Sequence, residues 1–482
     1  MSRINLSKII KSGLWLTAGF GITKGIRFIA QIVLVRLLTP EQFGIWGMVL
    51  VVTHLMTLFK DTAISGVLIQ RGLENKTLVN TVYSLAINVS MVLFFLQIGL
   101  GYGASHFFQE PIVFSLTSCA AFSFLLSAGA GCHDAVLQRR MQFREVAIAA
   151  TTSNFVRFGG AVLLAALGYG VWSFAMAKIA SSFVKTCLRI RFSGYSFQYH
   201  LLPDRAALKD VRGFIGSLVG INLAVYINTN GDNILVGKLL GPRELGFYNL
   251  AYQLAMLPAF AFSQMNRINF SVLSQKDARG QRRYLSRMLE VGAITSAPFY
   301  GIAFVVAPWL IPLVYGDTWQ PIVGLFQIVL VFAYARSFMS ILGTALNALN
   351  HPEVNAVINW LLIPVSLPAF YFGVKWGGVQ GLALVVALVM GVGASLWFWV
   401  ATCRVAGWNL WHLVQPVVLP TLASSLMVAI ATSIPFPNDI VKWVLQPLVV
   451  VLGYLAIVSI ASRGQIPRLL LDLSKRTFSA KA

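Results

Sequence analysis

Five basic side chains lie near the middle of apolar segments long enough to cross a lipid bilayer. Two of them fall in the run from Ser12 to Val35, which exceeds the roughly 20 residues that a helix needs to span about 30 Å of hydrocarbon. A Lys or Arg at the bilayer centre costs roughly 2.5–3.5 kcal/mol on insertion scales, so such residues usually face a bundle interior or a watery cavity. The five central cations are Lys24, Arg27, Arg157, Lys178 and Arg336.

This excess of positive charge predicts an anionic substrate. Only Asp61 and Asp232 are plausible acids inside the apolar segments, and two carboxylates cannot neutralise five cations. At an effective dielectric near 20, a charge pair about 4 Å apart contributes roughly 4 kcal/mol, so several cations could offset the dehydration of a diphosphate. Arginine adds bidentate phosphate geometry and lysine a movable point charge.

Each residue also has a structural interpretation. A single cation could reach the interface or form an ion pair, as Asp61 could do with its neighbour Lys60. Asp61 and Asp232 could alternatively bind a coupling cation. Gln31 shares the helical stripe of Lys24 because it lies seven residues further on. The secondary cavity candidates are Gln31, Lys60, Tyr226 and Asn233.

The first apolar segment and the turn after it recur with an offset of 202 residues. The turn Arg36-Leu-Leu-Thr-Pro-Glu-Gln-Phe-Gly44 aligns without a gap to Lys238-Leu-Leu-Gly-Pro-Arg-Glu-Leu-Gly246. Both apolar runs also carry Gly-x-x-x-Gly, which permits close helix approach, at Gly21/Gly25 and Gly216/Gly220. Because six predicted spans separate the copies, we expect parallel repeats with a substrate site between two lobes.

Composition places the chain among integral membrane proteins. Hydrophobic residues make up 57% of its 482 residues, charged residues 11%, and the mean hydropathy is +0.74. About fourteen apolar runs predict an all-α protein, with breaks at glycine or proline such as Gly377-Gly378. The loops between these runs fall into two alternating sets, and the set that includes both termini holds 25 basic residues while the other holds 4. This asymmetry predicts that both termini are cytoplasmic. It also explains the net charge of +21 without a role in nucleic-acid binding.

These runs predict four regions. Residues 1–190 form an N-lobe of six transmembrane helices, and residues 191–212 form a basic cytoplasmic linker. Residues 213–403 form a C-lobe of six further helices. Residues 404–482 add two transmembrane helices and a basic cytoplasmic tail.

Motifs for catalysis are missing from the sequence. It has no P-loop, no H-E-x-x-H and no G-x-S-x-G. Its four cysteines form no C-x-x-C pair, and the outward loops carry only scattered acids. We therefore expect a transporter rather than an enzyme, with neither cofactor nor metal. A lipid-linked glycosyltransferase would need acidic groups gathered for base or metal chemistry.

Several segments resemble the polysaccharide transporter branch of the MOP superfamily, nearest to Wzx-type O-antigen flippases and colanic-acid exporters. The resemblance covers nearly the whole chain in matching order. Its most specific part is Gly231 to Ala255, which begins Gly-Asp-Asn-Ile-Leu-Val-Gly-Lys. The other segments are Arg36 to Gly44, Leu137-Gln-Arg-Arg-Met-Gln-Phe-Arg144 and Gly170-Val-Trp-Ser173.

The resemblance implies a MATE-like fold and a flippase of the bacterial inner membrane. Such a flippase moves undecaprenyl-diphosphate-linked oligosaccharide to the outer leaflet for O-antigen, capsule or exopolysaccharide synthesis, by rocking two lobes around a cationic cavity. A polysaccharide polymerase and a chain-length regulator are candidate partners. Two alternatives stay open: a flippase for another lipid-linked anion, such as a peptidoglycan precursor, and a MATE-like small-molecule exporter, for which central carboxylates would be expected.

Overall fold

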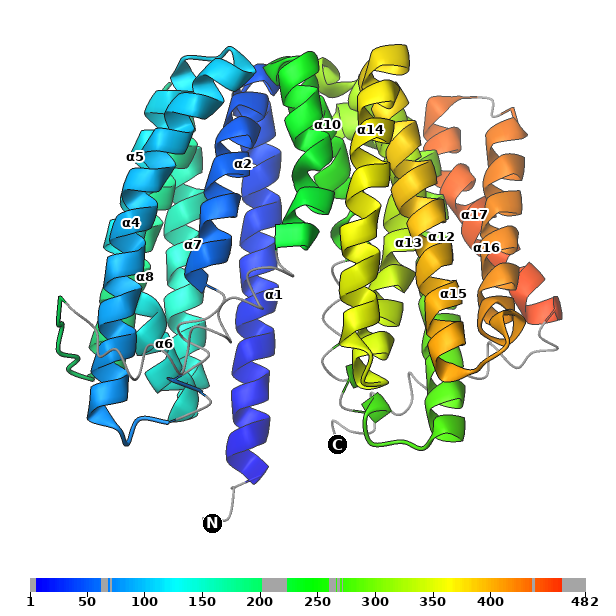
Figure 1. The fold of residues 1–482 in the computed structure, drawn as a ribbon. Coiled ribbons are helices and arrows are strands. Elements are labelled where there is room, and N and C mark those ends of the chain that lie inside the picture. The colour runs from blue at the N-terminus through cyan, green and yellow to red at the C-terminus, as the bar shows by residue number, and fades with distance from the viewer. Residues whose placement is uncertain are drawn as a thin grey trace. The chain divides into compact units, whose positions relative to one another are not determined.

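The part of the chain that the structure describes consists of helices joined by turns and loops (Figure 1). This structure, a computed structural model, describes residues 6–61, 68–69, 72–201, 223–259, 266, 269–270, 272–435 and 438–461. No strand occurs within these ranges, so the predicted all-α class is confirmed.

The described helices include many membrane spans. Eight are long and apolar enough to cross a bilayer, or nine if the pair α5 (Ile112–Leu126) and α6 (Ala130–Arg139), bent by 44°, forms one span. One of the eight runs from Pro352 to Ala406, yet Gly377 and Gly378 leave helical geometry inside it, at the predicted break. The chain is thus a multi-pass membrane protein, and fourteen spans stays a prediction.

The chain divides into two compact units, the first comprising Met1–Asn249. In this unit α7 packs against α1 and α8, α4 against α2 and α5, and α8 also against α5 and α6. Residues 223–239 are helical and α10 begins near the end of the unit. The remaining bounds are α1 (Leu6–Leu37), α2 (Pro40–Asp61), α4 (Lys76–Phe108), α7 (Phe143–Ala166), α8 (Trp172–Ser193) and α10 (Pro242–Ala255).

The two copies of the turn motif meet inside this first unit. A Cβ atom added to Gly44 would lie 1.6 Å from the Pro242 carbonyl oxygen, and one added to Gly246 would lie 1.9 Å from that of Pro40. Pro40 aligns with Pro242 and Gly44 with Gly246, so each copy presents its glycine to the other copy's proline. A two-fold axis relating the copies produces this reciprocity, which supports the repeat inferred from the sequence.

Close helix approach at Gly21 and Gly25 stays a prediction. No heavy atom of a described neighbour lies within 4 Å of a Cβ built on either glycine, and Gly216 and Gly220 lie outside the described residues. Among the described residues, α1 makes a close contact at Gly19, where an added Cβ would lie 3.1 Å from the Ala147 Cβ on α7. The rotation of a helix about its own axis decides which small residue meets its neighbour.

The second unit comprises Leu250–Ala482. In it α12 packs against α13, α16 and α17, and α13 against α14 and α15. Within α14 the chain turns sharply at Gly377 and Gly378, and a Cβ on Gly381 would lie only 2.3 Å from the Gly373 carbonyl oxygen across this turn. The bounds are α12 (Ala278–Tyr315), α13 (Ile322–Ala348), α14 (Pro352–Val385), α15 (Ala394–Ala406), α16 (Leu410–Ser433) and α17 (Asp439–Ala461).

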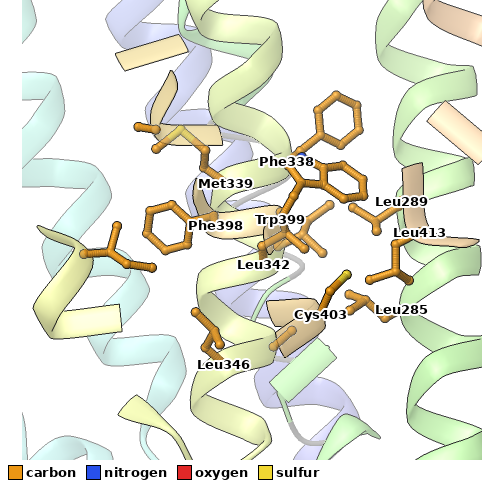
Figure 2. Packing of buried hydrophobic residues seen from close by; sticks show 14 of the residues in the cluster. Leu285, Leu289, Phe338, Met339, Leu342, Leu346, Phe398, Trp399, Cys403 and Leu413 are labelled. Atoms are coloured by element: carbon orange, nitrogen blue, oxygen red, sulfur yellow. The ribbon is translucent and has the colours of Figure 1, made fainter. Parts of the chain in front are cut away.

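A buried apolar cluster joins α12, α13, α15 and α16 in this unit. Figure 2 shows Leu342 and Phe338 of α13 among side chains that include Trp399 of α15 and Leu285 of α12. The last two helices are also tied to α12 by hydrogen bonds. The Ser424 hydroxyl donates to the carbonyl of Ala297 at 2.7 Å, and the Tyr454 hydroxyl to that of Ile294 at 3.0 Å.

Candidate anion-binding site

Four of the five predicted central cations lie in the first unit, on three helices that pack together. Lys24 and Arg27 come from α1, Arg157 from α7 and Lys178 from α8, and α7 contacts both of its neighbours. The charge of Arg27 acts on Lys24 and on Arg157. The charges of Arg157 and of Lys60, which lies in α2, act on Lys178. We call Lys24, Arg27, Arg157, Lys178 and Lys60 the cationic tract.

The fifth predicted cation lies elsewhere. Arg336 is a half-buried residue of α13 in the second unit. The structure defines each unit separately, so a shared site of Arg336 with the cationic tract stays a prediction.

A cavity of about 210 Å³ opens at one end of the tract, inside the first unit. The Lys60 ammonium donates a hydrogen bond to the Ser127 hydroxyl and lies 5.3 Å from the centre of the Phe124 ring. Both side chains therefore hold this cation at the cavity wall. The charged and hydroxyl residues that line the cavity are Lys60, Lys178, Lys185, Arg189, Thr57, Ser90, Ser123, Ser127, Ser182 and Thr186.

The cavity combines basic side chains with buried hydroxyls that have no partner among the described residues. Arg189 is paired with Asp134 at 3.1 Å between Nη2 and Oδ2, and the described lining residues include three lysines. Ser90 is 1% exposed and Thr186 8% exposed, and neither hydroxyl oxygen has a hydrogen-bond partner in the described part of the chain. Burying an unpaired polar group costs about 1–3 kcal/mol, so these hydroxyls favour a ligand. The arrangement suits an oxyanion, with lysines supplying charge and hydroxyls donating hydrogen bonds.

The secondary candidates lie apart from this cavity lining, except Lys60. Tyr226 is buried and its hydroxyl donates to the Val51 carbonyl at 2.5 Å, which ties the helix of residues 223–239 to α2. Asn233 is half-buried, and its side-chain oxygen has no partner among the described residues. Gln31 is half-buried on α1.

Asp232 is 3% exposed and is held by hydrogen bonds. Its Oδ2 accepts from the Tyr248 hydroxyl at 2.7 Å and its Oδ1 from the Asn233 backbone N–H at 2.8 Å. No ion pair joins it to a basic residue within the described ranges. Asp61 ends α2, and its side chain lies outside the described residues.

Tyr248→Phe is expected to destabilise the protein by about 1–3 kcal/mol, because the buried Asp232 carboxylate loses the hydrogen bond from the Tyr248 hydroxyl. Thermal unfolding of the detergent-solubilised protein measures the change. The added substitution Asp232→Asn is the control: removing the charge should recover part of the loss, as coupled neighbours do in a double-mutant cycle. An unchanged unfolding temperature in Tyr248→Phe contradicts the stabilising role.

The site predicted from the sequence omitted three charged or titratable residues. His54 of α2 lies where the charges of Lys178, Arg157 and Arg27 act on it, and Lys185 and Arg189 of α8 line the cavity. The α8 residues follow Lys178 by seven and eleven positions, so helical periodicity puts them on its face. His54 stands in an apolar segment, and a titratable residue in such a segment is itself a sign of a functional site. In the described part of the chain, no three His, Cys, Asp or Glu side chains gather to hold a metal ion.

Comparison with known sequences finds relatives in surface-polysaccharide synthesis. The profile of a family described as "Polysaccharide biosynthesis protein" matches residues 33–324. The lipopolysaccharide biosynthesis protein WzxC of Escherichia coli (strain K12) is 24% identical over 436 residues, which cover 89% of this chain and 88% of the relative.

Two solved structures share the fold. The lipid II flippase MurJ, in an inward closed conformation, superposes with a TM-score of 0.77 at 15% identity, covering 94% of this chain and 99% of that one. An inward-facing MATE family transporter of the MOP superfamily superposes with a TM-score of 0.60 at 15% identity, covering 79% and 94%. The predicted MATE-like fold is confirmed.

Proposed function

Because the chain belongs to the polysaccharide biosynthesis protein family, we propose that it is a Wzx-type flippase. It carries undecaprenyl-diphosphate-linked oligosaccharides across the membrane for surface polysaccharide synthesis. The family membership, the relative named for lipopolysaccharide biosynthesis and the fold shared with a lipid flippase all support this function. The protein acts as a transporter and not as an enzyme.

The observation that carries the proposal is the cationic tract, in which Arg27 is exposed and the other four residues are half-buried. Arg27 lies within electrostatic reach of Lys24 and Arg157, and both Arg157 and Lys60 lie within reach of Lys178. A cavity with one further lysine, Lys185, adjoins them. Like charges held together in a membrane domain repel one another and lose hydration, so an anion that binds between them is strongly favoured. A diphosphate supplies that charge, and Arg and Lys suit its oxygens.

Several finer statements belong to the same proposal. The protein resides in the bacterial inner membrane with both termini in the cytoplasm, as the alternation of basic loops supports. Residues 1–190 and 213–403 act as lobes that alternate access to the tract, with residues 191–212 as the linker and residues 404–482 as an accessory region. Arg336 of α13 is a further candidate contact for the substrate. A polymerase and a chain-length regulator receive the product.

Transport by the purified full-length protein tests the proposal. Proteoliposomes receive a fluorescent undecaprenyl-diphosphate-linked oligosaccharide, and a membrane-impermeant reagent reports how much reaches the opposite leaflet. We expect flipping well above that of protein-free liposomes, and little flipping of lipid II or of a cationic dye in parallel samples. Equal rates for all three substrates, or none above the background, contradict the assignment. Faster transport of lipid II supports the peptidoglycan-precursor alternative.

A further inference from the structure

A second basic pocket lies in the second unit, far along the chain from the cationic tract. It has a volume of about 430 Å³ and lies between the first turns of α12 and the turn from α15 to α16. Its described lining residues include four basic ones and no acid. The residues are Ala278, Arg279, Arg282, Arg283, Ser286, Trp408 and His412.

The three arginines occupy one face of α12. Arg279, Arg282 and Arg283 stand at positions i, i+3 and i+4, which are neighbours on a helix surface. No ion pair joins any of them to a carboxylate in the described part of the chain. The two nearest acids in sequence are already engaged: Asp277 caps α12 by accepting from the Gly280 N–H at 3.1 Å, and Glu290 accepts from Arg287 at 2.6 Å.

The opposite wall is the turn from α15 to α16. Trp408 lies between Gly407, whose φ of 66° ends α15, and Asn409, whose side chain caps α16 by accepting from the Trp411 N–H. The Trp408 backbone N–H donates to the Cys403 carbonyl at 2.9 Å. The indole packs on the apolar cluster to which Leu285 of α12 also belongs. Figure 2 shows Leu285 and Leu289 of α12, members of this cluster, beside Leu413 of α16.

We propose that this pocket binds the phosphate-bearing headgroup of an acidic phospholipid. Three arginines held on a fixed face can surround phosphate oxygens, and an amphipathic indole beside them is typical of the membrane interface. Basic pockets between the ends of membrane-spanning helices are a known way to hold acidic headgroups. The pocket lies at the start of a helix that is long and apolar enough to cross the membrane, and its volume accommodates a phosphate with an attached alcohol. This inference does not depend on the proposed transport function.

Lipid binding to the purified full-length protein tests the proposal. Native mass spectrometry measures apparent affinity for phosphatidylglycerol and for phosphatidylcholine in mixed micelles. We expect the wild type to prefer phosphatidylglycerol, and Arg282→Gln/Arg283→Gln to bind it at least tenfold more weakly. Arg287→Gln is the matched control: it lies one turn further on the same helix, but is paired with Glu290 and lies outside the pocket lining.

Further arms separate the sources of phosphate. Arg282→Lys/Arg283→Lys keeps the charge but loses the bidentate geometry, so we expect an intermediate affinity. Equal binding of the acidic lipid to wild type and the glutamine variant overturns the proposal. So does tighter arginine-dependent binding of inorganic phosphate or of a prenyl diphosphate, which would identify another ligand. Unfolding temperatures measured without added lipid verify that the variants are folded.

Discussion

Arg157→Ala and Arg27→Ala are each expected to abolish export of surface polysaccharide while the protein still inserts into the membrane. Arg157 stands between the charges of Arg27 and Lys178, so its removal divides the cationic tract. Losing one charge-assisted contact to a diphosphate costs about 1.5–3 kcal/mol, and a loss of about 3 kcal/mol lowers occupancy of the site roughly a hundredfold. Restoration of export in a strain lacking the native transporter measures the effect.

The control for this experiment is Lys76→Ala. Lys76 is an exposed lysine at the first residue of α4 and lies outside the cavity lining, so export should stay at the wild-type level. Membrane content of each variant is measured by immunoblot. Normal export by both arginine variants at normal membrane content would show that the tract does not hold the substrate.

Gly44→Ala is expected to disrupt the contact between the two copies of the turn motif. The new Cβ would lie 1.6 Å from the Pro242 carbonyl oxygen, which belongs to backbone and cannot rotate away. Alanine suits a helix, so the effect is steric, and overpacking of this kind costs about 1–3 kcal/mol or more. We expect a lower unfolding temperature in detergent and loss of export. Gly246→Ala should behave alike, since its Cβ would lie 1.9 Å from the Pro40 carbonyl oxygen.

Gly25→Ala serves as the matched control for these variants. Gly25 lies in α1, and a Cβ built on it meets nothing within 4 Å among the described residues. Its unfolding temperature should match or exceed that of the wild type, because alanine is the better helix former. If Gly44→Ala is as stable and active as Gly25→Ala, the contact between the two copies does not hold the first unit together.

The sequence predicted the class of fold better than it predicted contacts between helices. Runs of apolar residues fix membrane helices because the bilayer sets their length, and the depth of Lys24 or Arg157 follows from position within a run. The turn containing Gly44 and its copy containing Gly246 revealed the repeat. Which of α1's glycines meets α7 depends on helix rotation, so the contact of Gly19 with Ala147 could not be predicted from the spacing of glycines along the chain.

Which residues lie together in the candidate site could be learned only from the structure. That α7 brings Arg27, Arg157 and Lys178 together is a property of packing and not of spacing along the chain. Nothing in the sequence marks Ser90 or Thr186, because a serine or threonine in a span usually bonds to its own helix backbone. Only the structure shows that their hydroxyls lack such partners beside a basic cavity.

Direct binding of a prenyl diphosphate tests the central claim. A short-chain prenyl diphosphate and the matching uncharged prenyl alcohol are titrated calorimetrically into the detergent-solubilised wild type and into Arg157→Ala/Lys178→Ala. We predict that the wild type binds the diphosphate at least tenfold more tightly than the alcohol, and that the double variant loses this preference while unfolding at a similar temperature. Equal affinity of the wild type for both ligands, or an undiminished preference in the double variant, would contradict the assignment of the cationic tract as the diphosphate site.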